Sequence, residues 1–313
     1  MNWRKTRIKR NKNESGKCFD GISCGRVALE RAGIKVDEYF ACEIKADAIK
    51  VTQANYPDTI QLGDVRNVDF KKLGKIDLFI GGSPCQDMSQ ANRDRKGLQG
   101  NKSSLFWEYM RGLNETKAPF FLLENVEMPA ADYATISNQL GVCAININSE
   151  LVSAQLRNRY YWTNIGPKQT DMFGMKYSAI PLPKDRKIYL QSILTHGYAD
   201  RKKARCLLES DSRPLRTVSR MLYRYFDQGF TTLVFDEKDV KESCRYLNQI
   251  ELERCQTLPD GYTSVLDRDS AAGCIGDGWT VDVIAHILSY MKEKLNINVA
   301  RKGSKQIRYE HKD

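Results

Sequence analysis

The stretch "LFIGGSPCQDMSQ", residues 78 to 90, places a cysteine directly behind a hydrophobic strand. The apolar run ends at Gly81 and Gly82, which allow backbone or ligand to approach closely. Pro84 has a restricted φ and stiffens the chain in front of Cys85. A thiol in this position becomes a nucleophile if its pKa falls below about 8.5 or if a reaction partner takes its proton. The alternative on spacing alone is a buried cysteine that closes the strand.

Strands and helices alternate on both sides of this stretch. Such alternation predicts an α/β fold with a mostly parallel sheet and helices on both faces. In that architecture ligands bind beyond the carboxyl ends of the strands. The predicted strands are residues 17–22, 38–44, 60–64, 76–82 and 119–126, and the predicted helices are residues 25–34, 46–56, 103–116 and part of 276–295.

Acidic residues follow three successive predicted strands, at Asp20, Glu43 and Asp64. Their charges would repel a phosphorylated dinucleotide, because like charges in one pocket are unfavourable. They suit a cofactor that offers a ribose, an adenine amino group and a cationic centre. S-adenosylmethionine fits that description. The stretch "FDGISCG", residues 19–25, stands where a cofactor loop is expected but is not the G-x-G-x-x-G dinucleotide signature.

A carboxyl group ends another buried strand, in "FFLLENV" at Glu124. On a strand next to that of Cys85, it could share a pocket with the thiol and take part in proton transfer. The stretch "SAQLRNRYYW" offers partners for a buried carboxylate, because Gln155, Arg157 and Arg159 alternate and would point to one face of a strand. The alternative is a ladder of polar side chains that faces solvent.

The protein is basic, with a formal net charge of +10 at pH 7. Lysine and arginine gather in residues 4–17 and 201–224, a pattern typical of proteins that bind polyanions. For residues 4–17 a solvated tail is an equally good explanation. The nine cysteines are scattered without a C-x-x-C pair, so we expect neither a metal site nor a disulfide framework. No apolar run is long enough to span a bilayer, and we expect a soluble, cytoplasmic protein that is associated with the nucleoid.

Six motifs in order resemble those of the cytosine-C5 DNA methyltransferase family. They are "FDGISCG", "GGSPCQ", "ENV", "QLRNR", "ELERCQTLPDGY" and "GDGWTVDVI". Within this family, the sequence most resembles the catalytic domain of the mammalian de novo DNA methyltransferases, although Gln86 follows the bacterial pattern. Because no regulatory domain precedes the motifs, we expect a bacterial or phage enzyme. The resemblance implies a Rossmann-like sheet that binds S-adenosylmethionine.

The resemblance implies a mechanism for methyl transfer to carbon 5 of cytosine in double-stranded DNA. The Cys85 thiolate would attack carbon 6 while Glu124 stabilises protonation at ring nitrogen 3. Arg159, with Arg157, would hold Glu124 and the carbonyl of the base. The target base must leave the duplex to be reached, so base flipping is implied. S-adenosyl-L-homocysteine would be the product.

The resemblance also implies binding residues. In the cofactor pocket, Phe19 would stack on the adenine, Glu43 would take the ribose, and Leu105 and Trp279 would close the site. The other implied cofactor residues are Asp20, Gly21, Ile22, Cys24, Ile44, Asp64, Val65, Gly82 and Gly278. The implied DNA-binding residues are Gln86, Ser89, Arg93, Arg95 and Lys96 in a closing loop, and Arg216, Arg220 and Arg224 in the recognition region. Asp277 departs from the family, which usually has asparagine, a basic or a small residue there.

The same reading divides the chain into residues 1–165, completed by 275–298, as the catalytic domain, residues 166–274 as the target recognition domain, and 299–313 as a polar tail. We favour a monomer. Two other functions stay open at this point. One is a tRNA cytosine-5 methyltransferase, although the C-F-T tripeptide of that branch is absent from the sequence. The other is a catalytically silent, DNA-binding regulatory relative.

Overall fold

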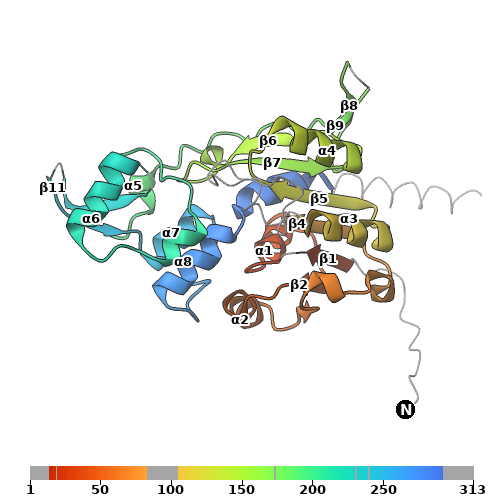
Figure 1. The fold of residues 1–313 in the computed structure, drawn as a ribbon, viewed down its shortest axis with the longest axis horizontal. Helices are drawn as coiled ribbons and strands as arrows, with labels where there is room; N and C mark the ends of the chain where they lie inside the picture. The colour runs from red at the N-terminus through yellow and green to blue at the C-terminus, as the bar shows by residue number, and fades with distance from the viewer. Residues whose placement is uncertain are drawn as a thin grey trace, which may run out of the picture.

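The computed structural model describes residues 14–18, 20–82, 105–172, 174–229, 231–238 and 240–291. Figure 1 shows a larger lobe built around a sheet and a smaller lobe that holds α5 (Leu190–Ile193), α6 (Val218–Tyr223) and β11 (Val240–Tyr246). A short hairpin of β8 (Lys168–Thr170) and β9 (Lys176–Ser178) projects from the larger lobe. Among the described residues, no helix has the length and apolar character needed to cross a membrane.

The larger lobe contains a seven-stranded sheet with the strand order β3-β2-β1-β4-β5-β7-β6. The first five strands in this order pair in parallel, and β7 is antiparallel to both of its neighbours. The carboxyl ends of the parallel strands therefore meet at one edge of the sheet. The strands are β1 (Glu14–Cys18), β2 (Glu38–Cys42), β3 (Ile60–Gln61), β4 (Leu78–Gly82), β5 (Phe120–Asn125), β6 (Ile145–Asn148) and β7 (Asn158–Thr163).

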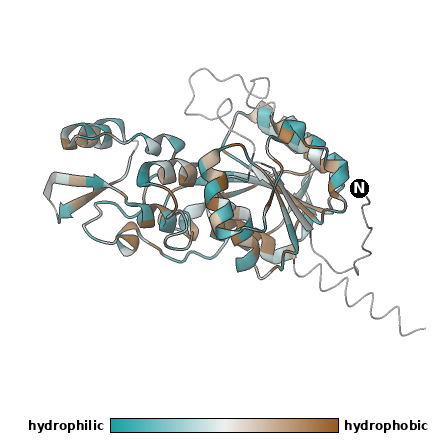
Figure 2. Ribbon diagram, turned by 90° about the horizontal axis from the view of Figure 1, so that it is seen from below, coloured by the Kyte–Doolittle hydropathy of each residue, from teal (hydrophilic) through white to brown (hydrophobic). Residues whose placement is uncertain are grey.

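Helices cover both faces of this sheet (Figure 2), which explains why the consecutive residues Leu78, Phe79 and Ile80 of β4 are all buried. Leu78 and Ile80 of β4 enter the core that includes α1 (Cys24–Arg31) and the helical residues 281–291. Phe79, between them, enters the opposite core with α3 (Leu105–Thr116) and α4 (Ala130–Leu140). A further helix, α2 (Ala46–Asn55), follows β2 and adds Ala48 and Val51 to the first core.

The smaller lobe has a core of its own. The antiparallel pair β10 (Leu233–Glu237) and β11 packs against α6 and the π-helical turn Arg224–Gln228. The buried members are Met221, Tyr225, Leu233, Phe235 and Cys244. The later helices α7 (Gln249–Cys255) and α8 (Arg268–Asp277) contribute instead to the core that contains α1. The division into two domains remains a prediction.

The structure confirms the α/β architecture and changes the extent of several predicted strands. The strand predicted at 17–22 is β1, which ends at Cys18. The strand predicted at 60–64 ends at Gln61, because Gly63 has a φ of +75° and Asp64 caps the 3-10 turn Val65–Asn67. The strand predicted to carry three alternating polar residues begins only at Asn158. The preceding segment pairs outside the sheet, with a bridge from Gln155 to Ala204.

Candidate active site

Glu124 lies at the carboxyl end of β5, in register with Gly82 at the end of β4. Its carboxylate is almost fully buried, with 8% of the residue exposed. Arg159 Nε lies 3.1 Å from Oε1, and Trp279 Nε1 donates to Oε2 at 3.0 Å. A buried carboxylate is costly unless such partners replace water. Glu124 is therefore a preorganised acid, held from two sides at the end of the strand that neighbours the one leading to Cys85.

Gly82 makes this arrangement sterically feasible. A Cβ at this position would lie 2.8 Å from Trp279 Nε1 and 3.0 Å from Glu124 Oε2. Both distances are shorter than ordinary contacts of a carbon atom. Gly82 was predicted to allow a close approach, and it leaves the space in which the Trp279 indole meets the Glu124 carboxylate.

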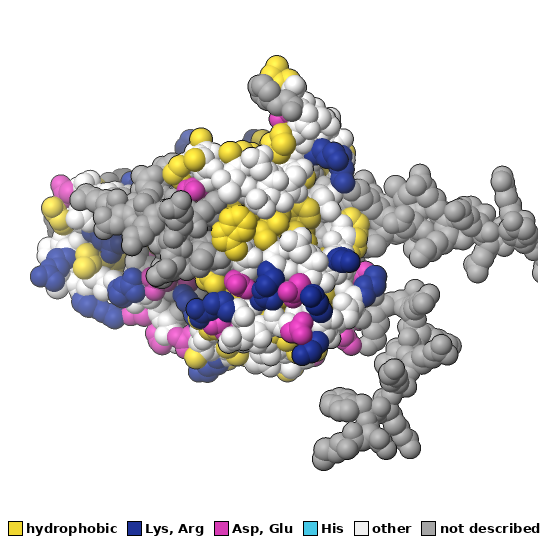
Figure 3. All heavy atoms as spheres, turned by 45° about the vertical axis from the view of Figure 1, so that its right-hand side comes forward, with side chains coloured by type: hydrophobic (Ala, Val, Ile, Leu, Met, Phe, Trp, Pro, Cys, Tyr) yellow, Lys and Arg dark blue, Asp and Glu magenta, His cyan; other side chains and the backbone are white. Residues whose placement is uncertain are grey.

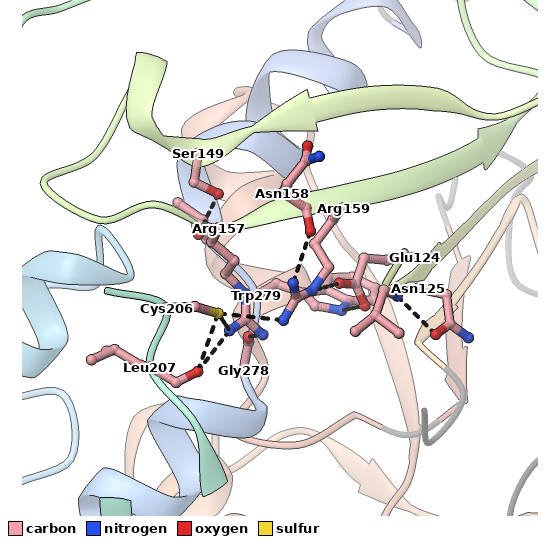
Figure 4. A network of polar contacts seen from close by, with 12 residues as sticks. Glu124, Asn125, Ser149, Arg157, Asn158, Arg159, Cys206, Leu207, Gly278 and Trp279 are labelled. Atoms are coloured by element: carbon pink, nitrogen blue, oxygen red, sulfur yellow. Dashed lines mark hydrogen bonds and ion pairs between the residues drawn. The ribbon is translucent and has the colours of Figure 1, made fainter. Parts of the chain in front are cut away.

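The two arginines beside the acid have different partners (Figure 4). Arg159 turns toward Glu124, and its Nη2 donates to Cys206 Sγ at 3.6 Å on the other side. Arg157 instead donates to the backbone carbonyls of Leu207 at 3.0 Å and Gly278 at 2.9 Å. Its guanidinium therefore joins the segment around Leu207 to the turn that carries Trp279. The structure therefore brings Arg159 to the acid and uses Arg157 to tie the surrounding backbone together.

A buried polar chain supports the same turn. Gln155 Nε2 donates to Gln256 Oε1 at 2.8 Å, and Gln256 Nε2 donates to the Gly278 carbonyl at 3.1 Å. Thr280 donates to Gln256 Oε1 at 2.8 Å and accepts from Ser149 at 2.9 Å. Each member is buried and hydrogen-bonded, which is the condition under which a polar network rigidifies a core.

The acids predicted at the strand ends lie along the carboxyl edge of the sheet, but they differ in accessibility. Asp20 is buried, and its carboxylate accepts hydrogen bonds from Tyr39 and Ser23. Glu43 is partly exposed and accepts from the amides of Gly21 at 2.7 Å and Ile44 at 2.8 Å. Asp20 therefore shapes the loop from within, whereas Glu43 lies within reach of a ligand.

The remaining predicted cofactor residues fall into two groups. Ile44 exposes 68% of its surface beside Glu43, which leaves an apolar side chain at the rim. Asp64 is half-buried, and hydrogen bonds from Arg66 lower the pKa of its carboxyl. Leu105 is half-buried at the first position of α3. The packed group consists of Ile22, Cys24 and Val65, which are buried, and Gly278, where a Cβ would lie 3.2 Å from Cys24 Sγ.

An ion pair crosses this edge between two motifs that are distant in sequence. Lys45 Nζ lies 2.5 Å from Asp277 Oδ2. Burial on its own would lower the pKa of the lysine, but the hydrogen bond and charge of Asp277 raise it above the ordinary value. Asp277, which departs from the family pattern, therefore pairs with Lys45, two residues after Glu43.

Seven predicted site residues lie outside the described residues. They are Phe19, Cys85, Gln86, Ser89, Arg93, Arg95 and Lys96. The structure describes the strand that leads to Cys85 and the acid beside that strand end. Within the described ranges, no group of histidine, cysteine and acidic side chains has the arrangement of a metal site.

The predicted DNA-binding arginines of the smaller lobe have different surroundings. Arg216 pairs with Asp269 at 2.6 Å. Arg220 and Arg224 line an open hollow together with Tyr223, which is 60% exposed. On the face of the molecule in Figure 3, basic and acidic side chains are intermixed, so the net positive charge is not concentrated there.

Two functional candidates had no signal in the sequence. Cys206 stands in "ARCLLES", which matches no motif, yet its sulfur contacts both arginines of the site. Lys45 follows the predicted Glu43, but nothing local indicates its pairing with a residue 232 positions away. Both depend on contacts between segments that are far apart along the chain.

Comparisons with known proteins bear on the family and the fold. The sequence model of the family described as "C-5 cytosine-specific DNA methylase" matches residues 16–169. The "Orphan methyltransferase M.SPRI" of Bacillus phage SPR is 38% identical over 111 residues, which are 35% of this chain and 25% of that protein. The "Type II methyltransferase M1.ScrFI" of Lactococcus lactis subsp. cremoris is 26% identical over 309 residues, which cover 88% of this chain and 77% of that protein.

Solved structures share the fold. The Entamoeba histolytica methyltransferase EhMeth aligns with a TM-score of 0.69 at 15% identity, over 91% of this chain and 99% of that one. The chain spans only a quarter of the length of the phage relative. Residues 16–169, which the family model matches, include β2 to β7 with Glu124 and Arg159. The resemblance found in the six motifs is confirmed, because residues 16–169 match the C-5 cytosine-specific DNA methylase family.

Proposed function

We propose that the protein is a DNA cytosine-5 methyltransferase that acts on a flipped-out cytosine through a covalent bond from Cys85 to carbon 6. The observation that carries the proposal is the Glu124 carboxylate, held by Arg159 at 3.1 Å and Trp279 at 3.0 Å beside the end of β4. Cys85 follows β4 by three residues. A nucleophile and an acid at neighbouring strand ends supply the two groups that addition to a pyrimidine needs.

Each side chain has a separate task in this proposal. The Cys85 thiolate forms a bond to carbon 6, and the displaced electron pair is accommodated at nitrogen 3 as that atom gains a proton. Glu124 stabilises this protonation, and Arg159 keeps the carboxylate oriented and excludes water from Oε1. Once carbon 5 carries the methyl group, loss of its proton re-forms the double bond to carbon 6, the bond to Cys85 breaks to restore the thiolate, and nitrogen 3 gives back its proton.

The carboxyl edge of the sheet supports S-adenosylmethionine as the methyl donor. When bound, S-adenosylmethionine supplies an electrophilic methyl group on a positively charged sulfur. Glu43 uses its carboxylate for the amides of Gly21, Ile44 and Lys45, and a carboxylate accepts about four hydrogen bonds, so one position stays open for a ribose hydroxyl. The exposed Ile44 beside it offers an apolar contact to the adenine ring.

The substrate is tested with the purified chain, labelled S-adenosylmethionine, duplex DNA and tRNA. We expect label in DNA. Cys85→Ala should abolish transfer, because the bond to carbon 6 cannot form, while DNA binding in a gel-shift assay stays close to that of the unaltered protein. Transfer that persists in Cys85→Ala would show that the nucleophile is another residue.

A second arm separates the substrate from the mechanism. Duplex DNA with 5-fluorocytosine should trap a covalent complex, because fluorine at carbon 5 cannot leave as a proton. The trapped peptide, identified by mass spectrometry, should contain residue 85. Label that appears only in tRNA would overturn the DNA proposal, and binding of DNA without transfer to either substrate would favour a silent regulatory relative.

A further inference from the structure

Cys206 lies at the site, on the opposite side of Arg159 from Glu124 (Figure 4). Arg157 Nη1 donates to Cys206 Sγ at 3.3 Å, and Arg159 Nη2 donates to it at 3.6 Å. Of the cysteines whose side chains the structure describes, only Cys143 and Cys206 are half-buried, and the others are buried. The sulfur of Cys206 is therefore close to two positive charges, in a residue that is only half-buried.

The backbone holds this sulfur in place. Ala204 N donates to the Ala154 carbonyl at 2.7 Å, and Leu156 N donates to the Ala204 carbonyl at 2.9 Å. Leu207 N donates to Gln155 Oε1 at 3.3 Å, just beyond the cysteine. The segment that carries Cys206 thus runs beside the segment that leads into Arg157 and Arg159, which brings the sulfur within reach of both guanidinium groups.

Each nitrogen of the Arg159 guanidinium contacts a partner. Nε faces Glu124, Nη1 donates to the Asn158 carbonyl at 2.8 Å, and Nη2 donates to Cys206. A planar guanidinium is oriented by the acceptors around it, because its N–H groups lie in fixed directions. Loss of the sulfur would let the plane rotate away from Glu124.

We propose that Cys206 is a positioning residue of this site: its sulfur accepts from Arg157 and Arg159 and keeps the guanidinium of Arg159 directed at Glu124. The inference rests on the proposed function for its catalytic consequence, but the contact itself can be tested without methyl transfer.

The electrostatic surroundings agree with a thiolate. Burial on its own would raise the pKa of the Cys206 thiol, but the charges of Arg157 and Arg159 outweigh it and hold that pKa below its ordinary value. Other described groups that face this position are Glu124, across Arg159, and the Tyr161 hydroxyl on β7. A thiolate is a stronger acceptor than a thiol, because hydrogen bonds to charged groups are the stronger ones.

The first test measures the thiol itself in the full chain. Alkylation by iodoacetamide is followed against pH by mass spectrometry of the tryptic peptide that spans residues 206–216, because trypsin does not cleave between Arg213 and Pro214. We expect a midpoint below the ordinary cysteine value of about 8.5, and a higher midpoint in Arg159→Gln, which removes one positive charge. A midpoint that is unchanged in Arg159→Gln would overturn the contact, whatever the protein methylates.

The second test measures the consequence for turnover. Cys206→Ala should lower kcat for methyl transfer by about tenfold, the effect expected for one charged hydrogen bond, and leave KM for S-adenosylmethionine within about twofold. Cys206→Ser retains an acceptor of similar size and should recover part of kcat. Cys143→Ala, the matched half-buried control, should retain full activity.

These outcomes separate two kinds of failure. If Cys206→Ala retains kcat in a protein that methylates DNA, the positioning role is wrong and the proposed function stands. If the unaltered protein methylates nothing but its residue 206 thiol responds to Arg159→Gln, the contact stands and the proposed function is wrong. Thermal unfolding of each variant shows whether a loss of kcat reflects a loss of folding.

Discussion

At the scale of single residues, the site depends on a position without a side chain. Gly82 lies against both Trp279 and Glu124. Because it has a hydrogen atom in place of a Cβ, the indole and the carboxylate can both pack against the end of β4. The sequence predicted the importance of this glycine from its place before the cysteine. It did not indicate which atoms the glycine leaves room for.

Gly82→Ala should therefore damage the site more than the fold. A Cβ 2.8 Å from Trp279 Nε1 has to displace the indole and break its hydrogen bond to Glu124. We expect a loss of about 1–3 kcal/mol in the free energy of unfolding, typical of overpacking, together with at least a tenfold loss of kcat. Urea unfolding and single-turnover methyl transfer measure the two effects.

Gly112 in α3 is a matched control for the steric change. A Cβ there would lie 2.5 Å from the Phe79 ring, within the core. Gly112→Ala should lower the free energy of unfolding to a similar extent, while kcat of the folded fraction is unchanged. Equal losses of kcat in both variants would show that Gly82 acts only through stability.

At the scale of elements, the ends of β2 and α8 are joined by charge. Lys45 and Asp277 lie two residues from Glu43 and Trp279, respectively, and their ion pair spans the carboxyl edge of the sheet. Side chains of both residues are about half exposed, at 54% and 40%. Exposed pairs contribute little to stability, typically 0.2–1 kcal/mol, so the effect should fall on the cofactor site and not on the fold.

Lys45→Ala and Asp277→Ala should each weaken the binding of S-adenosylmethionine by about two- to fivefold, the range that such a pair can supply. The double variant should be no weaker than either single one, because both remove the same interaction. Isothermal titration at low and high salt measures this, and the difference from the unaltered protein should shrink as salt screens the pair. Additive losses in the double variant would contradict the coupling.

At the scale of the whole molecule, the two lobes are joined by buried polar groups. Arg245 of β11 contacts Glu251 of α7 at 2.7 Å, and Glu251 also accepts from the Thr195 amide at 2.8 Å. Glu251 is fully buried. The pair thus links the hairpin of the smaller lobe to a helix that packs in the core of the larger one.

This junction should make stability depend on acidity. Burial would raise the pKa of Glu251, but hydrogen bonds from Arg245 and from the amides of Asn248 and Thr195 lower it below its ordinary value. A depressed pKa stabilises the fold above the unfolded value of about 4.3, and that stability is lost as the pH falls from there through the folded pKa. Acid should therefore weaken the junction below about pH 4.3.

Glu251→Gln removes the titrating group and tests this assignment. We expect a loss of about 3 kcal/mol in the free energy of unfolding at pH 7, because Arg245 keeps its charge without a partner. The variant should also lose less stability than the unaltered protein between pH 5 and pH 3. Glu209→Gln, in the exposed pair with Arg213, is the control and should change both quantities little. Parallel pH curves for all three proteins would contradict the role of Glu251.

The whole molecule also shows which features of the fold and the site could be predicted from the sequence. The order of strands and helices, the neighbouring positions of β4 and β5, and the acids at the strand ends were all predicted, because apolar periodicity and chain order act locally. The prediction that Gln155, Arg157 and Arg159 lie on one strand was wrong for the first two residues. The strand begins at Asn158, and Gln155 pairs with Ala204 outside the sheet. That partner lies 49 residues away, beyond the reach of any local pattern.

The sequence by itself determined an α/β sheet with Glu124 at the end of the strand beside β4, since burial of apolar strands leaves few places for a carboxyl group. Only the tertiary structure decided what holds the carboxylate. Trp279 reaches it from 155 positions away, and Cys206 meets Arg159 from 47 positions away. Contacts of this kind depend on how packed lobes place their surfaces, because hydrogen bonds and ion pairs act over a few ångströms and are indifferent to separation along the chain.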